Sequence, residues 1–138
     1  MPLQYISEDR LRIDEIIENI LEHGDNLENY YTMVNDEVEA VCNAEGVLTA
    51  NIPVDIDGYV TSSTLRMYAT YYALWLINNG YRGSGGGNNN DVYGASADEW
   101  EILYKEKRKE LNIYVINGDD GTTIINPQNT VRQTFFAI

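Results

Sequence analysis

The sequence predicts a mainly α protein: a small bundle of about four helices followed by a C-terminal β-hairpin or extended arm. Two observations support this fold class. Apolar residues recur at helical spacing in about four segments before residue 112, and glycine, proline or asparagine separates these segments. After residue 112 the chain becomes rich in β-branched residues. With 138 residues, the chain is long enough for one domain with a modest core.

The first helix is predicted to begin after Ser7, which can act as its N-cap, and to end at His23 and Gly24. Its apolar residues are spaced three, one, three and one positions apart: Ile13, Ile16, Ile17, Ile20 and Leu21. This spacing places them on one helix face. Charged residues lie between them, which is typical of a helix with one solvated side.

A second helix is predicted to open at Asp25, because Glu28 follows three residues later as in a capping box. Gly46 is its predicted stop. Its apolar stripe consists of Leu27, Tyr30, Tyr31, Val34, Val38, Val41 and Cys42. The following segment contains Pro53 and Gly58, which exclude a simple helix and leave room for two short extended pieces.

The third helix is predicted to run from about Ser63 to Asn79 and to form the core of the bundle. Its centre, YYALWLI, is apolar around most of its circumference, as expected of a helix enclosed on several sides. After a linker, Ser96 and Glu99 form a second capping box that opens a fourth helix. That helix has an apolar face made of Trp100, Leu103, Tyr104 and Leu111.

The rest of the chain is predicted to be extended. The sequences IYVIN and TTIIN flank GDDG, which suggests a hairpin, and an apolar tail, TVRQTFFAI, follows Pro127. We therefore divide the chain into a helical domain, residues 1–117, with a flexible Gly/Asn loop at 82–94, and an extended hairpin and C-terminal arm, residues 118–138.

Acidic residues are concentrated in the first part of the chain. Residues 1–60 contain fourteen acids and two bases, a net charge of 2 − 14 = −12, whereas residues 61–138 contain eight acids and seven bases, a net charge of 7 − 8 = −1. Such a surface repels nucleic acid, so ordinary DNA or RNA binding is disfavoured. A negative wall can still serve beside DNA as a surface to which DNA does not adhere.

No membrane partner is expected. The longest apolar run, YYALWLI, is far shorter than the roughly 20 residues that a membrane span requires. The N-terminal sequence MPLQYISEDR lacks the basic-then-apolar order of a signal peptide, so we expect a soluble, intracellular-type protein.

The glycine-rich stretch GYRGSGGGNNND raises the question of a phosphate-binding loop. Such a loop follows a strand, opens a helix and carries a lysine followed by serine or threonine. Here the preceding segment has helical spacing, and no lysine occurs between Arg82 and Lys105. The stretch is better explained as a flexible linker.

The sequence DIDGYVTSSTL is similar to the middle of an EF-hand calcium loop. If Gly58 is aligned with the turn glycine, however, Pro53 occupies the first ligand position and Thr64 the position of the bidentate glutamate. A metal-free turn at Asp57 and Gly58 explains the same residues. We expect no metal site, and calcium binding is kept as an alternative.

No catalytic residue and no cofactor are predicted. Nucleophilic catalysis by Cys42, the single cysteine, would require a histidine, and the single histidine is His23. A hairpin of the first two helices would separate these residues by about 25 Å at 1.5 Å per residue. Cys42 is better explained as a small buried apolar residue and His23 as a helix-terminal residue. Carboxylate pairs such as Asp36 with Glu39 occur by chance in an acidic helical protein.

The apolar tail is unusual because Phe135 and Phe136, the two phenylalanines of the chain, lie near its end. Chain ends are usually loose in a monomer. The tail therefore either folds back onto its own domain or docks on another chain.

The order of these elements resembles that of the head-to-tail connector adaptors of tailed bacteriophages. The resemblance covers most of residues 7–117: two short amphipathic helices, an irregular segment with a proline, the apolar helix SSTLRMYATYYALWLINN, a loop and a late helix. At residue level, VNDEVEAVCNAEGV is similar to the family's second helix and its exit, and EWEILYKEKRKELN to its late helix.

This resemblance implies a structural virion protein without enzymatic activity, which forms a ring, commonly of twelve copies, below the portal and extends the DNA channel. Its partners would be the portal protein, a downstream stopper or tail protein and further copies of itself, while DNA passes through without specific binding. It would be located in the neck of the virion, and in the host cytoplasm during assembly. The expected portal or subunit interface consists of Val131, Phe135, Phe136 and Ile138.

Two other functions remain open on the sequence. One is a small acidic module that binds another protein or calcium. The other is an enzyme that uses carboxylates.

Overall fold

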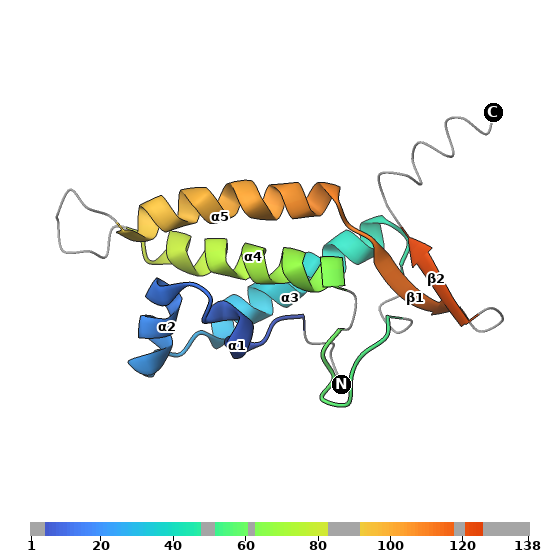
Figure 1. Ribbon diagram of the computed structural model, residues 1–138, viewed down its shortest axis with the longest axis horizontal. Helices are drawn as coiled ribbons and strands as arrows, with labels where there is room; N and C mark the ends of the chain where they lie inside the picture. Colours follow the sequence, from blue (N-terminus) through green and yellow to red (C-terminus); the bar gives the residue numbers. More distant parts are fainter. Residues whose placement is uncertain (1–4, 48–51, 61–62, 83–91, 118–120, 126–138) are drawn as a thin grey trace.

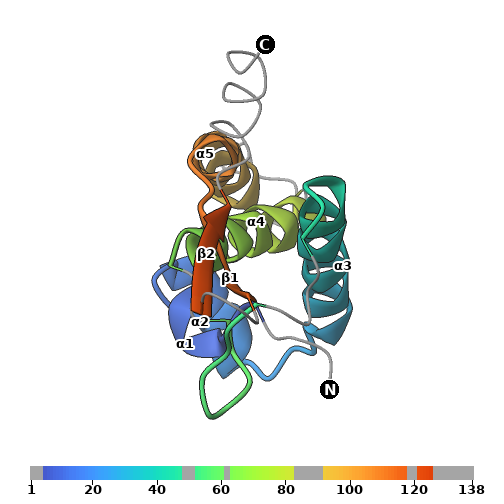
Figure 2. The ribbon, with the colours of Figure 1, turned by 90° about the vertical axis from the view of Figure 1, so that its right-hand side faces the viewer.

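The computed structural model has one central helix, α4 (Ser63–Gly80), which the other helices cover (Figure 1). The structure describes residues 5–47, 52–60, 63–82, 92–117 and 121–125. The helix α5 (Val92–Lys109) lies along one side of α4, while α1 (Glu8–Leu11), α2 (Glu15–Glu22) and α3 (Glu28–Ala44) cover its other sides (Figures 1 and 2). The mainly α fold is confirmed, with five helices in the described residues where about four were predicted.

The core is built around α4, as its sequence predicts. In the described part of the chain, every pair of helices in substantial contact includes α4. Five of its apolar side chains are completely buried: Leu65, Ala69, Ala73, Leu74 and Ile77. Complete burial of one leucine or isoleucine stabilises the fold by roughly 1.5–3 kcal/mol. Within the described ranges, no helix combines the length and the apolar character that crossing a bilayer requires.

The predicted first helix is wrong in one respect, because two helices, α1 and α2, replace it. The chain turns between them, and Ile13, a member of the predicted apolar face, is 61% exposed. Asp14 is the N-cap of α2, and its Oδ1 accepts a hydrogen bond from the backbone N–H of Ile16 at 2.9 Å. Ser7 occupies the N-cap position of α1 but makes no capping hydrogen bond through its side chain.

The break between α1 and α2 places the Asp14 carboxylate in the core. Asp14 is only 8% exposed. Its Oδ2 accepts hydrogen bonds from Asn78 Nδ2 of α4 at 3.0 Å and from Trp100 Nε1 of α5 at 2.7 Å. Hydrogen bonds to an ionised acceptor are stronger than those between neutral groups. This cluster therefore joins α2, α4 and α5.

The helix α3 begins later than predicted and ends where predicted. Asp25 does not open it. Instead, Asn26 Oδ1 accepts a hydrogen bond from the backbone N–H of Glu28 at 2.9 Å. The carboxylate of Asp25 accepts a hydrogen bond from the hydroxyl of Tyr81 at 3.0 Å. The predicted stripe faces the core, with Tyr30 and Tyr31 half-buried and the other members buried.

The end of α3 is a glycine cap. Gly46 has a φ of +74°, in the left-handed region that glycine adopts without steric cost. The N–H of Gly46 donates to the Asn43 carbonyl at 3.1 Å, and the N–H of Val47 donates to the Cys42 carbonyl at 2.9 Å. These two bonds form the Schellman motif, and Val47 is buried as that motif favours.

The helix α5 begins at Val92, so the predicted start at Ser96 is wrong, and the predicted loop at 82–94 extends too far. The capping box of Ser96 and Glu99 lies inside the helix. Packing explains the earlier start: Tyr93 packs on Tyr81 with ring centroids 5.5 Å apart, and Gly94 and Ala97 are buried. Small residues let helix backbones approach closely, so tertiary contact outweighs the local capping preference. The central residues of the loop, 83–91, lie outside the described residues.

After α5 come two strands, β1 (Ile113–Asn117) and β2 (Gly121–Ile125), which pair antiparallel. The register pairs Ile113 with Ile125 and Asn117 with Gly121, so the proposed domain boundary at residues 117 and 118 passes between the paired strands. Thr64 fixes the entry to β1, since its Oγ1 accepts the N–H of Asn112 at 2.9 Å and donates to the Asn112 carbonyl at 2.6 Å.

Replacing Asp14 by alanine should destabilise the fold by about 3 kcal/mol, because the N–H donors of Asn78 and Trp100 would be left unpaired in the interior and α2 would lose its cap. Urea denaturation followed by circular dichroism measures this loss. Asp25→Ala is the matched control, because it removes an exposed aspartate with a single side-chain hydrogen bond to Tyr81. Equal losses for the two variants would contradict the role assigned to Asp14.

Candidate functional site

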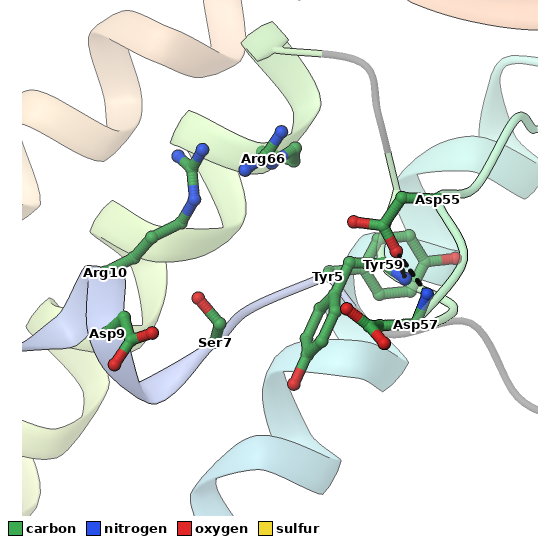
Figure 3. Close-up of a pocket in the computed structure, with 8 residues that line it drawn as sticks. All are labelled: Tyr5, Ser7, Asp9, Arg10, Asp55, Asp57, Tyr59 and Arg66. Atoms are coloured by element: carbon green, nitrogen blue, oxygen red, sulfur yellow. Dashed lines mark hydrogen bonds between the residues drawn. The ribbon is translucent and has the colours of Figure 1, made fainter.

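A cavity of about 210 Å³ lies between α1, the turn at residues 54–60 and the first turns of α4 (Figure 3). Its lining is polar and consists of Tyr5, Ser7, Asp9, Arg10, Asp55, Asp57, Tyr59 and Arg66. Pockets for drug-sized ligands or cofactors span about 300–1,000 Å³. This cavity can therefore accommodate a small ion or one side chain, but not a nucleotide.

One wall of the cavity is a tight turn whose aspartate is already engaged. Asp55 Oδ1 accepts the backbone N–H groups of Asp57 at 2.9 Å and of Tyr59 at 3.0 Å. Gly58 has a φ of +88°, and Val54 pairs with Val60 in an isolated antiparallel bridge. The predicted turn at Asp57 and Gly58 is thus present. In the described part of the chain, no group of three or more His, Cys, Asp or Glu side chains is placed to hold a metal ion.

Two arginines also line the cavity and are called its arginine wall: Arg10, which lies beside Asp9 on α1 and across from Asp55 and Tyr59, and Arg66 on α4 (Figure 3). Burial, and after it the positive charge of Arg66, lowers the pKa of Arg10. Both side chains are only partly exposed. Two like charges near each other in a partly buried site repel more strongly than they would in water.

Neither of these two guanidinium groups has an acidic partner among the residues that the structure describes. The other arginines in these ranges do: Arg12 pairs with Glu22 at 2.8 Å, Arg82 with Asp98 at 2.9 Å and Arg108 with Glu45 at 3.6 Å. Unpaired arginines are unexpected in a chain with a net charge of −13. Sequence reasoning missed the pair because Arg10 and Arg66 are brought together only by the packing of α1 on α4.

A second polar and aromatic cluster lies between α4 and α5. Tyr72 packs against Trp75 and Tyr104, with ring centroids 5.4 and 5.1 Å apart. Tyr68 belongs to the same cluster and is 2% exposed, while the rings of Tyr72, Trp75 and Tyr104 are half-buried. Burial raises the pKa of Tyr72 and of Tyr104. The cluster is part of the packing between the two helices.

Cys42 and His23 do not form a reactive pair. Cys42 is completely buried in α3, and burial followed by the charge of Glu39 raises the pKa of its thiol to about 11. The thiol is therefore protonated at neutral pH, and the thiolate is the reactive form. His23 is exposed at the C-cap of α2. These placements match the interpretation of Cys42 as a small apolar core residue.

The predicted interface residues lie outside the part of the chain that the structure describes. These are Val131, Phe135, Phe136 and Ile138 of the C-terminal tail. Their contacts remain a prediction.

The burial of Cys42 predicts slow alkylation of the native protein. At pH 8, iodoacetamide should react about 100-fold more slowly with native than with urea-unfolded protein, because raising the thiol pKa from 9.0 to about 11 lowers the thiolate fraction by roughly that factor. Mass spectrometry of the quenched reaction measures both rates. Similar rates in the two states would show that the thiol is accessible.

Calcium should leave the melting temperature unchanged, because Asp55, the first aspartate of the turn, already accepts hydrogen bonds from two backbone N–H groups. Any ion that binds the folded state stabilises it by mass action, so a thermal shift assay with and without millimolar calcium tests this. A rise in melting temperature that disappears in the Asp55→Ala/Asp57→Ala variant would establish the calcium site.

Comparison of the chain with protein-family models, with curated proteins and with solved structures gave no match.

Proposed function

We propose that the protein is a head-to-tail connector adaptor of a tailed bacteriophage, a structural virion protein that forms a ring below the portal and extends the DNA channel toward the tail. The order of the described elements supports this. The helices α1 and α2, which together replace the first helix of that order, and α3 precede an irregular segment with Pro53, and the apolar helix α4 and the late helix α5 follow.

The observation that carries the proposal is the segregation of acidic residues. No lysine or arginine occurs between Arg12 and Arg66, and this stretch contains α2 and α3, which cover sides of α4 that α5 leaves open (Figure 2). We give the name α2–α3 acidic surface to four of its exposed acids: Glu15, Asp25, Glu28 and Asp36. Such a surface facing a channel repels DNA phosphates, so DNA can pass without adhering.

The side of the molecule formed by α5 differs in charge. The C-terminal end of α5 carries both positive and negative charges. Lys105 donates a hydrogen bond to Glu101 and Lys107 donates one to Glu110, each with an N–O distance of 3.0 Å. A ring subunit needs two different contact surfaces, one for each neighbour. The difference between the α5 side and the α2–α3 side is compatible with that requirement.

The apolar tail would supply the contact with the portal. Burying an aromatic or branched aliphatic side chain contributes roughly 1.5–3 kcal/mol, so a few such residues suffice for a docking segment. In this proposal Phe135, Phe136 and Ile138, with Val131, dock on the portal or on a neighbouring subunit. The downstream partner is a stopper or tail protein, and further copies complete a ring, commonly of twelve.

The proposal predicts that the protein binds an assembled portal ring through its tail. Deleting residues 130–138 should abolish co-purification with the portal protein encoded in the same genome, while the melting temperature of the helical domain stays nearly unchanged. Size-exclusion chromatography and negative-stain electron microscopy of the co-expressed pair measure binding and the added ring density.

The control for this experiment is Ile102→Ser, which removes an exposed apolar side chain from α5 without touching the tail. It should bind the portal as the wild type does. If the deletion lowers the melting temperature strongly and leaves portal binding intact, the tail packs on its own domain and the proposed contact is wrong. Wild-type protein that never joins portal-containing particles would contradict the adaptor function itself.

A further inference from the structure

We propose that Arg10 and Arg66 form a carboxylate-binding site that receives an acidic side chain from the α2–α3 acidic surface of a second copy of this chain. The inference deepens the proposed function, and it rests on that function in requiring that copies of the protein contact one another. It assigns a role to the arginine wall of the cavity.

The two arginines of the cavity lack a counter-charge in the described residues. Arg10 and Arg66 face one cavity (Figure 3), and within the described residues neither forms an ion pair, although the chain holds 22 acidic against 9 basic residues. Arg12, two residues from Arg10, does have acidic partners, in Glu18 and Glu22. A carboxylate between Arg10 and Arg66 would offset their mutual repulsion, and the planar guanidinium matches a carboxylate with two parallel hydrogen bonds.

Two of the three acids that line the cavity, Asp55 and Asp57, lie away from Arg10, whereas the third, Asp9, is the neighbour of Arg10 on α1 (Figure 3). Asp55 Oδ1 is occupied by the N–H groups of Asp57 and Tyr59. Asp55 and Asp57 lie on the wall opposite Arg10 (Figure 3). The carboxylates of Asp55 and Asp57 thus lie away from Arg10, and an added carboxylate fits beside the two arginines rather than beside these two acids.

This division of charge selects the kind of ligand. A phosphate or a DNA backbone carries charge over several oxygens and would also meet the carboxylates of Asp9, Asp55 and Asp57, which line the same cavity. A single carboxylate on a side chain brings one charge and can reach the arginine wall alone. The volume of about 210 Å³ is also small enough to be filled by one side chain.

The source of that side chain follows from charge complementarity. The α2–α3 acidic surface belongs to a stretch without any lysine or arginine, so it attracts positive groups on another copy more than any part of the chain that mixes both signs. The cavity lies at α1, the turn at 54–60 and the start of α4, and its lining includes none of the acids that define that surface. The contact therefore joins two different patches. Repetition of such a heterologous contact generates a ring when the rotation closes.

The test is the self-association of the full chain, measured by sedimentation velocity in about 20 mM and about 500 mM NaCl, because charge pairs weaken as salt screens them. The wild type should associate at low salt and less so at high salt. Arg10→Gln/Arg66→Gln should weaken association at least about tenfold, which corresponds to one lost charge-assisted pair. Its melting temperature should not fall, since the change removes a repulsion.

The matched control is Lys105→Gln/Lys109→Gln, which removes two positive charges from exposed positions on α5. It should associate like the wild type. Equal weakening by both double variants would mean that only net charge matters, and this result would overturn the proposal. A wild type that stays monomeric at about 1 mM protein in low salt would overturn it as well.

A second measurement identifies the acid and does not depend on the stability of the double variant. Arg66→Lys keeps the charge and offers an amine to a zero-length carbodiimide cross-linker. In a mixture of ¹⁴N- and ¹⁵N-labelled chains, mass spectrometry should find mixed-isotope cross-links from position 66 to Glu15, Asp25, Glu28 or Asp36. Cross-links confined to a single chain, or directed only to other acids, would contradict the site.

The outcomes separate this inference from the proposed function. If the Arg10→Gln/Arg66→Gln variant joins portal particles and forms the ring as well as the wild type does, the carboxylate site is wrong and the adaptor function stands. If arginine-dependent self-association is present but the wild type never joins portal particles, the adaptor function is wrong and the carboxylate site stands.

Discussion

The buried carboxylate of Asp14 joins three helices that are far apart in the sequence. One oxygen caps α2, and the other accepts the N–H groups of Asn78 in α4 and Trp100 in α5. A buried charge is favourable only where donors compensate its lost hydration, and these three donors do so. The same residue ends the turn after α1, and α1 in turn packs on α4. The position of Arg10 beside Arg66 therefore depends on this junction.

The parts of the fold that the sequence predicts correctly are those decided by local patterns. The stripe of α3 and the apolar circumference of α4 are recognisable because each helix buries residues at its own regular spacing. Gly46 marks the end of α3 because only glycine adopts the required positive φ at no cost. The break before Asp14 and the early start of α5 were not predictable in this way. Both depend on partners in other elements: Asn78 and Trp100 for Asp14, and Tyr81 for Tyr93.

The same distinction between local and long-range features applies to the candidate site. The turn at Asp55–Gly58 is local, so the residue types of this short segment are enough to predict it. The excess of acid between Arg12 and Arg66 is likewise visible in the sequence. The proximity of Arg10 and Arg66 is not visible in the sequence, because no periodicity or motif relates these two residues. The structure connects these observations: Arg12 and Arg66 bound the acidic stretch, and Arg10, two residues before Arg12, lines the same cavity as Arg66 and, like Arg66, forms no ion pair in the described residues. In the proposed contact, one copy offers acid in excess and the cavity of another offers positive charge.

The central claim is that copies of this chain assemble through two different surfaces into a closed ring. Native mass spectrometry of the purified wild-type protein at low ionic strength tests it most directly, because the mass gives the number of subunits. A heterologous contact that closes predicts one dominant oligomer with a fixed number of subunits, dissociating to monomers as salt is raised. A dimer that remains the largest species at every protein concentration would contradict the claim, because a two-fold contact uses the same surface on both copies and leaves none for a ring.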